Sequence, residues 1–151
     1  MAVIISQEAP DSDEARPLID ELEEDLGGGI YPDESQHGYS IEKLLSEGVA
    51  FFMVRVDGAA AGCGGVQIFG EYGELKRMYI RPEFRGQGLG RLLVEHLADH
   101  ARGHGARLLR LETGIYQTDA IRLYERMGFY EIPPFGPYLL DPNSVFYERE
   151  S

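Results

Sequence analysis

Arg85-Gly86-Gln87-Gly88-Leu89-Gly90 is the stretch of sequence from which the fold and the function are predicted. It lies between a strand-like run, 74–80, and a helical run that begins with Arg91. Glycines let the backbone approach a ligand closely, and the amides at a helix N-terminus have no intrahelical acceptor. These amides and the helix dipole favour an anion, most often a phosphate. We therefore expect an anion-binding turn with Arg85 and Arg91 on either side, the alternative being an ordinary glycine-rich turn.

The spacing of this turn argues against the two common nucleotide-binding loops. A Walker loop needs Lys followed by Ser or Thr after its final glycine, whereas Gly90 is followed by Arg91 and Leu92. A dinucleotide-binding turn needs the spacing G-x-G-x-x-G, whereas the glycines here follow G-x-G-x-G. The anion is therefore expected to be neither an ordinary nucleoside triphosphate nor a dinucleotide.

Two motifs resemble one known family. Arg85, Gly88 and Gly90 match the signature Arg/Gln-x-x-Gly-x-Gly/Ala of the GNAT superfamily of acyl-CoA-dependent N-acyltransferases, in which this loop holds the pyrophosphate of coenzyme A. The run 81–84 is similar to the family's lead-in, and Leu123-Tyr124-Glu125-Arg126-Met127-Gly128-Phe129 is similar to its second motif. The resemblance covers about 75 residues, from position 74 to about position 147. It implies acetyl-CoA as the cofactor.

The resemblance also implies which residues contact the cofactor. The amide of Met78 would serve the thioester carbonyl, and the backbone of Ile80 would pair with the pantetheine arm. Gln117 stands where the family often carries an Asn that contacts this arm. The complete expected set is Met78, Tyr79, Ile80, Arg85, Gly86, Gln87, Gly88, Leu89, Gly90, Arg91, Gln117 and Tyr124.

The chemistry of N-acylation indicates two catalytic roles. An alkyl amine with a pKa of about 10 must lose a proton before it attacks a thioester. By resemblance, Glu74 is the first candidate for the general base and Glu112 the second, the alternatives being a chain of waters and an exposed, structural Glu74. Tyr124 matches the family tyrosine whose phenol protonates the coenzyme A thiolate. Its alternative role is that of a core tyrosine.

Length, composition and charge restrict the type of protein. The chain has 151 residues, 43% of them hydrophobic, so residues 1–151 are expected to form one domain. One cysteine, no signal-like start and no long apolar run predict a cytoplasmic protein without a membrane segment. The net charge of −12 lies mainly in residues 1–50, and an acidic chain is repelled by nucleic acid. We expect neither nucleic acid nor membrane as a partner.

Hydrophobic periodicity and turn signals predict a mixed sheet with helices. Asp57-Gly58 predicts a two-residue hairpin turn, and Pro17 predicts that the first helix begins near Ala15. The fold class is α/β (α+β), with one twisted sheet, and the resemblance implies that the central strands splay apart to admit the cofactor. The expected strands are 2–7, 49–56, 60–69, 72–80, 107–113, 129–132 and 145–148, and the expected helices are 15–26, 40–46, 90–102 and 118–127.

Several other features favour structural roles. His96, His100 and His104 repeat every four residues, but no further ligands complete a site, so we predict no metal. Cys63 lies in a run of small residues and is expected to be a buried thiol. The acidic run 20–25 is interpreted as a solvated helix face, the alternative being attraction of a cationic acceptor.

The sequence therefore predicts transfer of an acetyl group to a primary amine by direct attack in a ternary complex. A small-molecule or amino-acid-like acceptor is favoured, because a Pro-rich loop with aromatic residues could enclose a compact pocket. Tyr31, Tyr39 and Tyr138, together with Glu112, are the candidate substrate contacts. The alternatives are acetylation of a protein N-terminus or lysine, and a coenzyme A-binding regulatory module without catalysis. Exposed edge strands would suit a homodimer.

Overall fold

The computed structural model describes residues 1–27 and 40–151, and it shows one seven-stranded sheet with the strand order β1-β2-β3-β4-β5-β7-β6. Parallel pairing occurs between β4 and β5, and every other neighbouring pair is antiparallel. The predicted mixed α/β class is confirmed. The strands are β1 (Val3–Gln7), β2 (Ala50–Val56), β3 (Ala59–Phe69), β4 (Tyr72–Ile80), β5 (Leu108–Gly114), β6 (Tyr130–Ile132) and β7 (Ser144–Glu150). The helices are α1 (Ala15–Gly27), α2 (Ile41–Ser46), α3 (Leu89–Gly103) and α4 (Thr118–Arg126).

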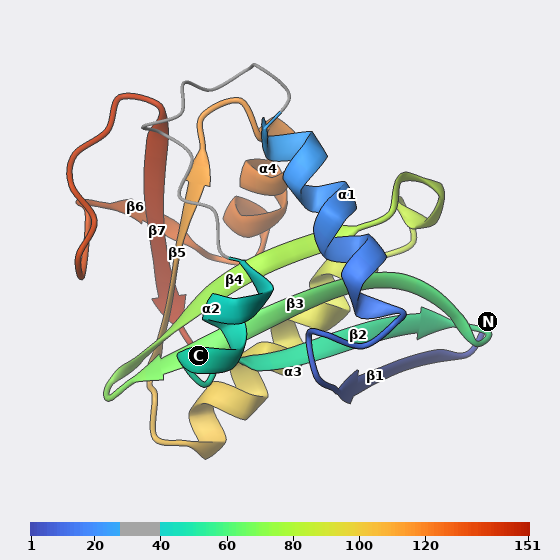
Figure 1. Ribbon diagram of the computed structural model, residues 1–151. Helices are drawn as coiled ribbons and strands as arrows, with labels where there is room; N and C mark the ends of the chain where they lie inside the picture. Colours follow the sequence, from blue (N-terminus) through green and yellow to red (C-terminus); the bar gives the residue numbers. More distant parts are fainter. Residues whose placement is uncertain (28–39) are drawn as a thin grey trace.

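The two central strands splay apart. Parallel pairing between β4 and β5 is limited to Tyr72–Glu74 against Leu108–Arg110. Figure 1 shows the two strands starting side by side and then diverging. Beyond Glu74, the edge of β4 that faces β5 has no strand partner within the described residues. The splay that the family resemblance implied is confirmed.

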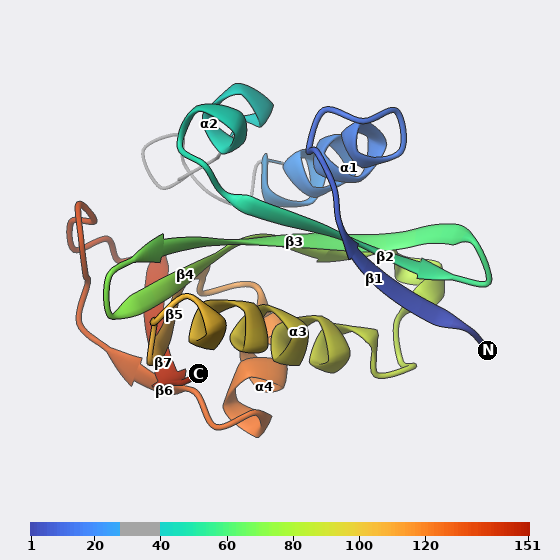
Figure 2. The same ribbon diagram turned by 90° about the horizontal axis from the view of Figure 1, so that it is seen from below.

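Helices cover both faces of the sheet (Figure 2). Helices α3 and α4 lie on one face, over the larger apolar core, and α1 and α2 lie on the other face, over a smaller one. Strand residues alternate between the two cores because successive side chains point to opposite faces. Leu75 packs in the core under α3, whereas Phe51 and Met53 pack under α1 and α2. Both faces of the central strands are therefore covered.

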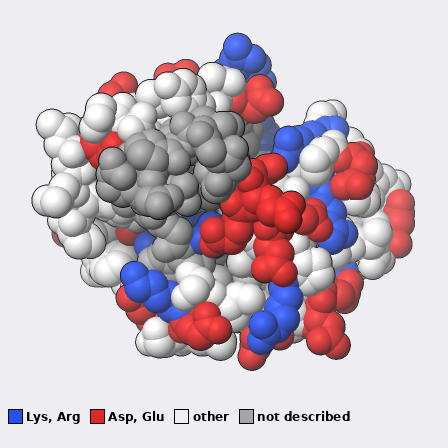
Figure 3. Space-filling model, turned by 45° about the horizontal axis from the view of Figure 1, so that its top comes forward, with Lys and Arg blue, Asp and Glu red and all other residues white. Residues whose placement is uncertain are grey.

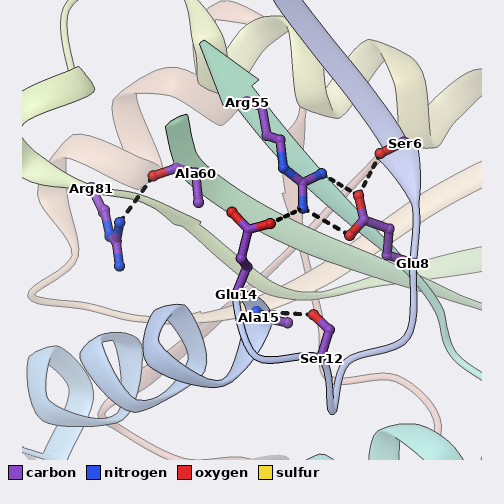
Figure 4. Close-up of polar contacts among 8 residues, drawn as sticks. All are labelled: Ser6, Glu8, Ser12, Glu14, Ala15, Arg55, Ala60 and Arg81. Carbon is purple, nitrogen blue, oxygen red and sulfur yellow. Dashed lines mark hydrogen bonds and ion pairs between the residues drawn. The ribbon is translucent and has the colours of Figure 1, made fainter. Parts of the chain in front are cut away.

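Helix α1 begins where the sequence predicts. The amide of Ala15 donates to the hydroxyl oxygen of Ser12 (3.1 Å), which caps the helix, and Pro17 falls in the first turn. Figure 4 shows this cap beside Arg55, whose guanidinium bridges Glu8 and Glu14. The ion pairs of Arg55 fix the start of α1 to β2.

The local turn predictions hold with small shifts at the element ends. Asp57 and Gly58 have φ angles of 50° and 86°, as a two-residue type I′ turn requires, and they join β2 to β3. Helix α3 begins at Leu89, one residue before its predicted start, and β6 begins at Tyr130, one residue after its own predicted start. Strands β1 and β6 form the two edges of the sheet.

Candidate active site

The glycine-rich turn has the backbone geometry of an anion site. Gly86 and Gly88 have φ angles of 80° and 78°, a region that glycine adopts without strain. The first hydrogen bond of α3 runs from the amide of Leu92 to the carbonyl of Gly88 (3.1 Å). The amides of residues 89–91 therefore have no intrahelical acceptor, and they lie at the positive end of the helix dipole.

The guanidinium of Arg85 turns away from this row of amides. Its Nε donates to the carbonyl oxygen of Ile80 (2.8 Å), Asp25 lies 3.6 Å from its terminal nitrogen, and its centre lies 5.7 Å from the ring of Tyr79. The expected positive charge on that side of the turn is thus partly neutralised by α1. Arg91, at the start of α3, is exposed. Arg85 shapes the end of β4 as well as adding charge.

Gly90 serves close packing between helices. A methyl group at this position would lie 2.9 Å from Cδ2 of Leu123, which precedes the tyrosine of the second motif in α4. The glycine signature and the second motif therefore meet in space, although they are far apart in the sequence. This contact places the N-terminus of α3 against α4.

A bulge interrupts β4 at Arg77 and Met78, where the predicted cofactor-binding residues begin, and sequence reasoning missed it. Cys63 pairs with Tyr79 and Gly65 with Lys76, so two residues of β4 oppose Gly64. Arg77 is one of them and has a φ angle of 57°, which is unusual for a side chain of this size. The available signal was indirect: the run of small residues on β3, 59–65, leaves space for a bulge.

The side chain of Tyr79 lies on the α1 side of the sheet. Its hydroxyl donates to Glu21 of α1 (3.2 Å), and the residue belongs to the core under α1 and α2. Burial, followed by Glu21 and Asp25, raises the pKa of Tyr79 to about 12. Its predicted cofactor contact is thereby restricted to the main chain, as for Met78 and Ile80.

Glu74 is buried, so the alternative of an exposed strand-start carboxylate is wrong. Its Oε2 accepts a hydrogen bond from the hydroxyl of Tyr138 (2.5 Å) and lies 3.2 Å from Nζ of the buried Lys76. Tyr138 comes from the Pro-rich loop between β6 and β7. Its pKa is raised, first by burial and then by the negative charge of Glu74 and its hydrogen bond. The structure thus joins a base candidate to a substrate-contact candidate.

Glu112 and several aromatic rings lie on the β5–β7 side of Glu74. The hydroxyl of Ser144 donates to Oε2 of Glu112 (2.7 Å). Phe135 and Tyr138 of the Pro-rich loop contact each other edge to face at 5.4 Å, and Tyr138 lies 5.5 Å from Phe146 of β7. These rings are the aromatic wall, defined as Phe135, Tyr138 and Phe146. The Pro-rich loop therefore lies beside Glu74, the first candidate for the general base.

Arg110 borders the aromatic wall from β5. Its guanidinium lies 4.4 Å from the ring centre of Tyr72 and 5.6 Å from that of Phe135. Its Nε also donates to Glu148 of β7 (2.7 Å). The cation is therefore held in place by two rings and a carboxylate, and sequence reasoning did not single it out.

Tyr124 lies in the core on the opposite face of the sheet from Glu74. Its ring contacts Phe129 edge to face at 5.4 Å, and burial raises its pKa to about 12. No residue in the described part of the chain forms a hydrogen bond with its hydroxyl. Every fully buried side-chain oxygen of the described residues has a hydrogen-bond partner, so this hydroxyl is not fully buried. The hydroxyl must therefore reach solvent, and it keeps its proton throughout the physiological pH range. Gln117 caps the same helix, α4, through its backbone.

The acidic run on α1 pairs with arginines of the neighbouring β4 segment. Glu21 contacts Arg81 at 2.9 Å, and Glu23 pairs with Arg77. Figure 3 shows acidic side chains gathered on this face, with basic side chains beside them. Most carboxylates of the run 20–25 are exposed, as the interpretation of a solvated helix face expects, and Glu21, Glu23 and Asp25 also form ion pairs with arginines.

The remaining predicted residues are placed as follows. His96 and His100 pack edge to face on Phe52, at 5.0 and 5.3 Å, and within residues 1–27 and 40–151 no group of His, Cys, Asp and Glu is arranged to hold a metal. Tyr31 and Tyr39 lie outside the described residues. Within the described ranges, no helix has the length and apolar character needed to cross a bilayer.

Comparison with known proteins agrees with this geometry. The family model described as acetyltransferase (GNAT) family matches residues 16–129. An IAA acetyltransferase of Azospirillum brasilense is 43% identical over 149 residues, which cover 97% of each chain. A Klebsiella pneumoniae protein described as an acyl-CoA N-acyltransferase has a solved structure that is 37% identical, covers 98% of this chain and 97% of its own, and superposes with a TM-score of 0.78. The fold is also shared with a PaiA N-acetyltransferase from Thermoplasma acidophilum (TM-score 0.78, 22% identity, 100% of both chains).

Proposed function

Because the chain belongs to the acetyltransferase (GNAT) family, we propose that residues 1–151 form one catalytic domain that acetylates a primary amine of a small-molecule acceptor, with acetyl-CoA as the acetyl donor. The observation that carries this proposal is the splay. Beyond Glu74 the β5-facing edge of β4 has no strand partner within the described residues, and it leads toward a turn with unsatisfied amides. Attack is direct, in a ternary complex.

The residues present fit coenzyme A. The amides at the start of α3, with Gly86 and Gly88 in the left-handed region, would hold its diphosphate. The open edge of β4 at Ile80 would pair with an extended, amide-containing arm as a further strand would. Bound acetyl-CoA supplies the acetyl group as a thioester.

Glu74 is the proposed general base. Tyr138 and Lys76 both contact its Oε2, and Oε1 has no hydrogen-bond partner in the described part of the chain. Oε1 would accept the proton that the acceptor ammonium must lose, directly or through a water. Glu112, on the neighbouring strand, is the second candidate.

Tyr124 is the proposed general acid, and the amide of Met78 is the proposed donor to the developing oxyanion. A phenol with a pKa of about 12 is protonated at neutral pH, so it can donate to a departing thiolate. A fixed amide aimed at developing charge typically contributes several kcal/mol, about 3 in known cases. The side chain of Met78 is less important for this role than its N–H.

The aromatic wall supports a compact acceptor. Phe135, Tyr138 and Phe146 pack against one another beside Glu74, and Tyr138, the partly exposed ring of the three, contacts its carboxylate. An amine on a small apolar body matches this combination. The Azospirillum brasilense relative is named for IAA, which supports a small-molecule acceptor.

A thiol-release assay with acetyl-CoA tests the proposal across small amines, amino acids, polyamines and short peptides. We expect rates that depend on a compact amine and fall in Glu74→Gln, whereas the exposed matched control Glu42→Gln keeps its rate. Rates only with peptides would instead support a protein acetyltransferase. If the protein binds coenzyme A but releases no thiol from acetyl-CoA with any acceptor, the result would support a regulatory module without catalysis.

A further inference from the structure

Helix α1 supports the part of β4 that has no strand neighbour on the β5 side. Three α1 carboxylates at alternate positions, Glu21, Glu23 and Asp25, pair with three arginines at four-residue intervals, Arg81, Arg77 and Arg85. Beyond Glu74, no ladder to β5 fixes the backbone of β4. Ion pairs to α1 therefore hold a segment that a sheet would normally hold from both sides.

The innermost of these pairs is the one at the bulge. The side chain of Arg77 is 3% exposed, whereas that of its partner, Glu23, is 48% exposed. The thiol of Cys63 lies 3.5 Å from the carbonyl oxygen of Arg77, and burial raises the thiol's pKa to about 12, so it keeps a proton to donate. Both the side chain and the carbonyl of Arg77 are thus fixed.

The left-handed backbone at Arg77 reverses the facing of the strand. In a regular strand, Leu75 and Tyr79 would share a face because side chains repeat every two residues. Here Leu75 packs under α3 and Tyr79 packs under α1. Gly64 makes room for the reversal, since a methyl group there would lie 2.5 Å from the sulfur of Met78.

We propose that the Arg77–Glu23 ion pair is a positioning device that holds Arg77 in the left-handed region and thereby aims the amide of Met78 at the open edge of β4. The pair acts through the backbone and does not touch substrate. The consequence for catalysis rests on the function proposed above, whereas the backbone effect does not depend on it.

Three changes at one position separate positioning from simple stability. Alanine at Arg77 removes the anchor and keeps the cost of a left-handed non-glycine residue, which corresponds to a factor of about ten. Glycine removes the same anchor without that cost. We expect Arg77→Ala to lower the turnover number about tenfold, Arg77→Gly to recover most of it, and coenzyme A affinity by calorimetry to change less than about threefold in both, because the diphosphate turn is untouched.

Two further variants complete the test. Glu23→Gln removes the ion pair without changing β4 and should lower turnover, and combining it with Arg77→Gly should cause no further loss, because glycine at position 77 leaves no guanidinium for Glu23 to pair with. Arg55→Ala is the matched control: it breaks an ion pair between the start of α1 and β2 (Figure 4) that does not involve β4, and it should leave turnover unchanged.

Amide hydrogen exchange provides a readout that needs no turnover. With acetyl-CoA bound to every protein compared, the Met78 amide should exchange at least about tenfold faster in Arg77→Ala and Glu23→Gln than in the unmodified protein, and Arg55→Ala should match the unmodified protein. Equal turnover losses in Arg77→Ala and Arg77→Gly, or unchanged exchange at Met78, would overturn the positioning role. If Arg77→Ala fails to fold, Glu23→Gln decides. Absence of thiol release from the unmodified protein would reject only the proposed function.

Discussion

Replacing Tyr124 by Phe isolates the proposed acid, because it removes one oxygen and leaves the ring in the core. The hydroxyl has no hydrogen-bond partner in the described part of the chain, so we expect the free energy of unfolding to change by less than about 0.5 kcal/mol. General acid catalysis typically contributes a factor of at least 100, equivalent to about 2.7 kcal/mol. Turnover should therefore fall about 100-fold while stability and coenzyme A affinity remain close to those of the unmodified protein.

Tyr147→Phe is the matched control for this prediction. Tyr147 is buried in the same apolar core, but its hydroxyl donates to Glu125 (3.2 Å). Its loss should cost about 1 kcal/mol of stability and leave turnover unchanged, the reverse of the result for Tyr124. The assays are thiol release at saturating acetyl-CoA and urea unfolding. A Tyr124→Phe enzyme with at least half the normal turnover, or an equal loss in Tyr147→Phe, would refute the acid role.

The pH dependence gives a second measure of the same role. Burial raises the pKa of Tyr124 from 10 to about 12, so the folded protein holds this proton more tightly than the unfolded chain does. The associated stability is complete below about pH 10 and is lost as the pH rises through 12. The unmodified enzyme should therefore show no loss of turnover from ionisation of this phenol between pH 7 and 10, and an alkaline decline in that range that disappears in Tyr124→Phe would contradict this expectation.

Three further variants test the base, the turn and the support of α1. Glu74→Gln removes the negative charge 3.2 Å from the buried Lys76, so it should lower the free energy of urea unfolding by about 3 kcal/mol. It also removes the proposed base, so the rate of thiol release should fall about 100-fold. Near-normal turnover would reject Glu74 as the base. Gly88→Ala places a side chain at a φ of 78° and should weaken coenzyme A binding about fivefold, as measured by calorimetry. An unchanged affinity would contradict the proposed role of this turn. Leu18→Ala, at a fully buried position on α1, should lower the free energy of unfolding by about 3 kcal/mol, and a loss below about 1 kcal/mol would show that α1 contributes little to the core.

Local patterns predicted the elements and the turn at residues 85–90 because their causes lie within a few residues. The hairpin at Asp57-Gly58, the start of α1 at Ala15 and the open amides at the start of α3 each follow from the sequence alone. The splay of β4 and β5 has no such local cause. It was expected from the family resemblance, and periodicity does not reveal it.

The features that sequence reasoning missed depend on partners far along the chain. Arginine has no preference for the left-handed region, and Glu23, which forms an ion pair with Arg77, is 54 positions away. Glu74 is bonded to Tyr138, 64 positions away, so its burial could not be inferred from its own strand. The arginines that pair with Glu21, Glu23 and Asp25 of α1 belong to another element, so these ion pairs could not be inferred from the helix itself.

The strand order β5-β7-β6 affects how the chain can fold while it is being synthesised. Strand β7 is inserted between two strands that precede it in the chain, and it is the sole strand neighbour of β6 in the described structure. Until the ribosome has released residues 144–150, β5 has only its three-residue contact with β4, and β6 has nothing to pair with. A nascent chain that stalls before this point exposes unpaired strand edges, which are the surfaces that chaperones must shield from aggregation.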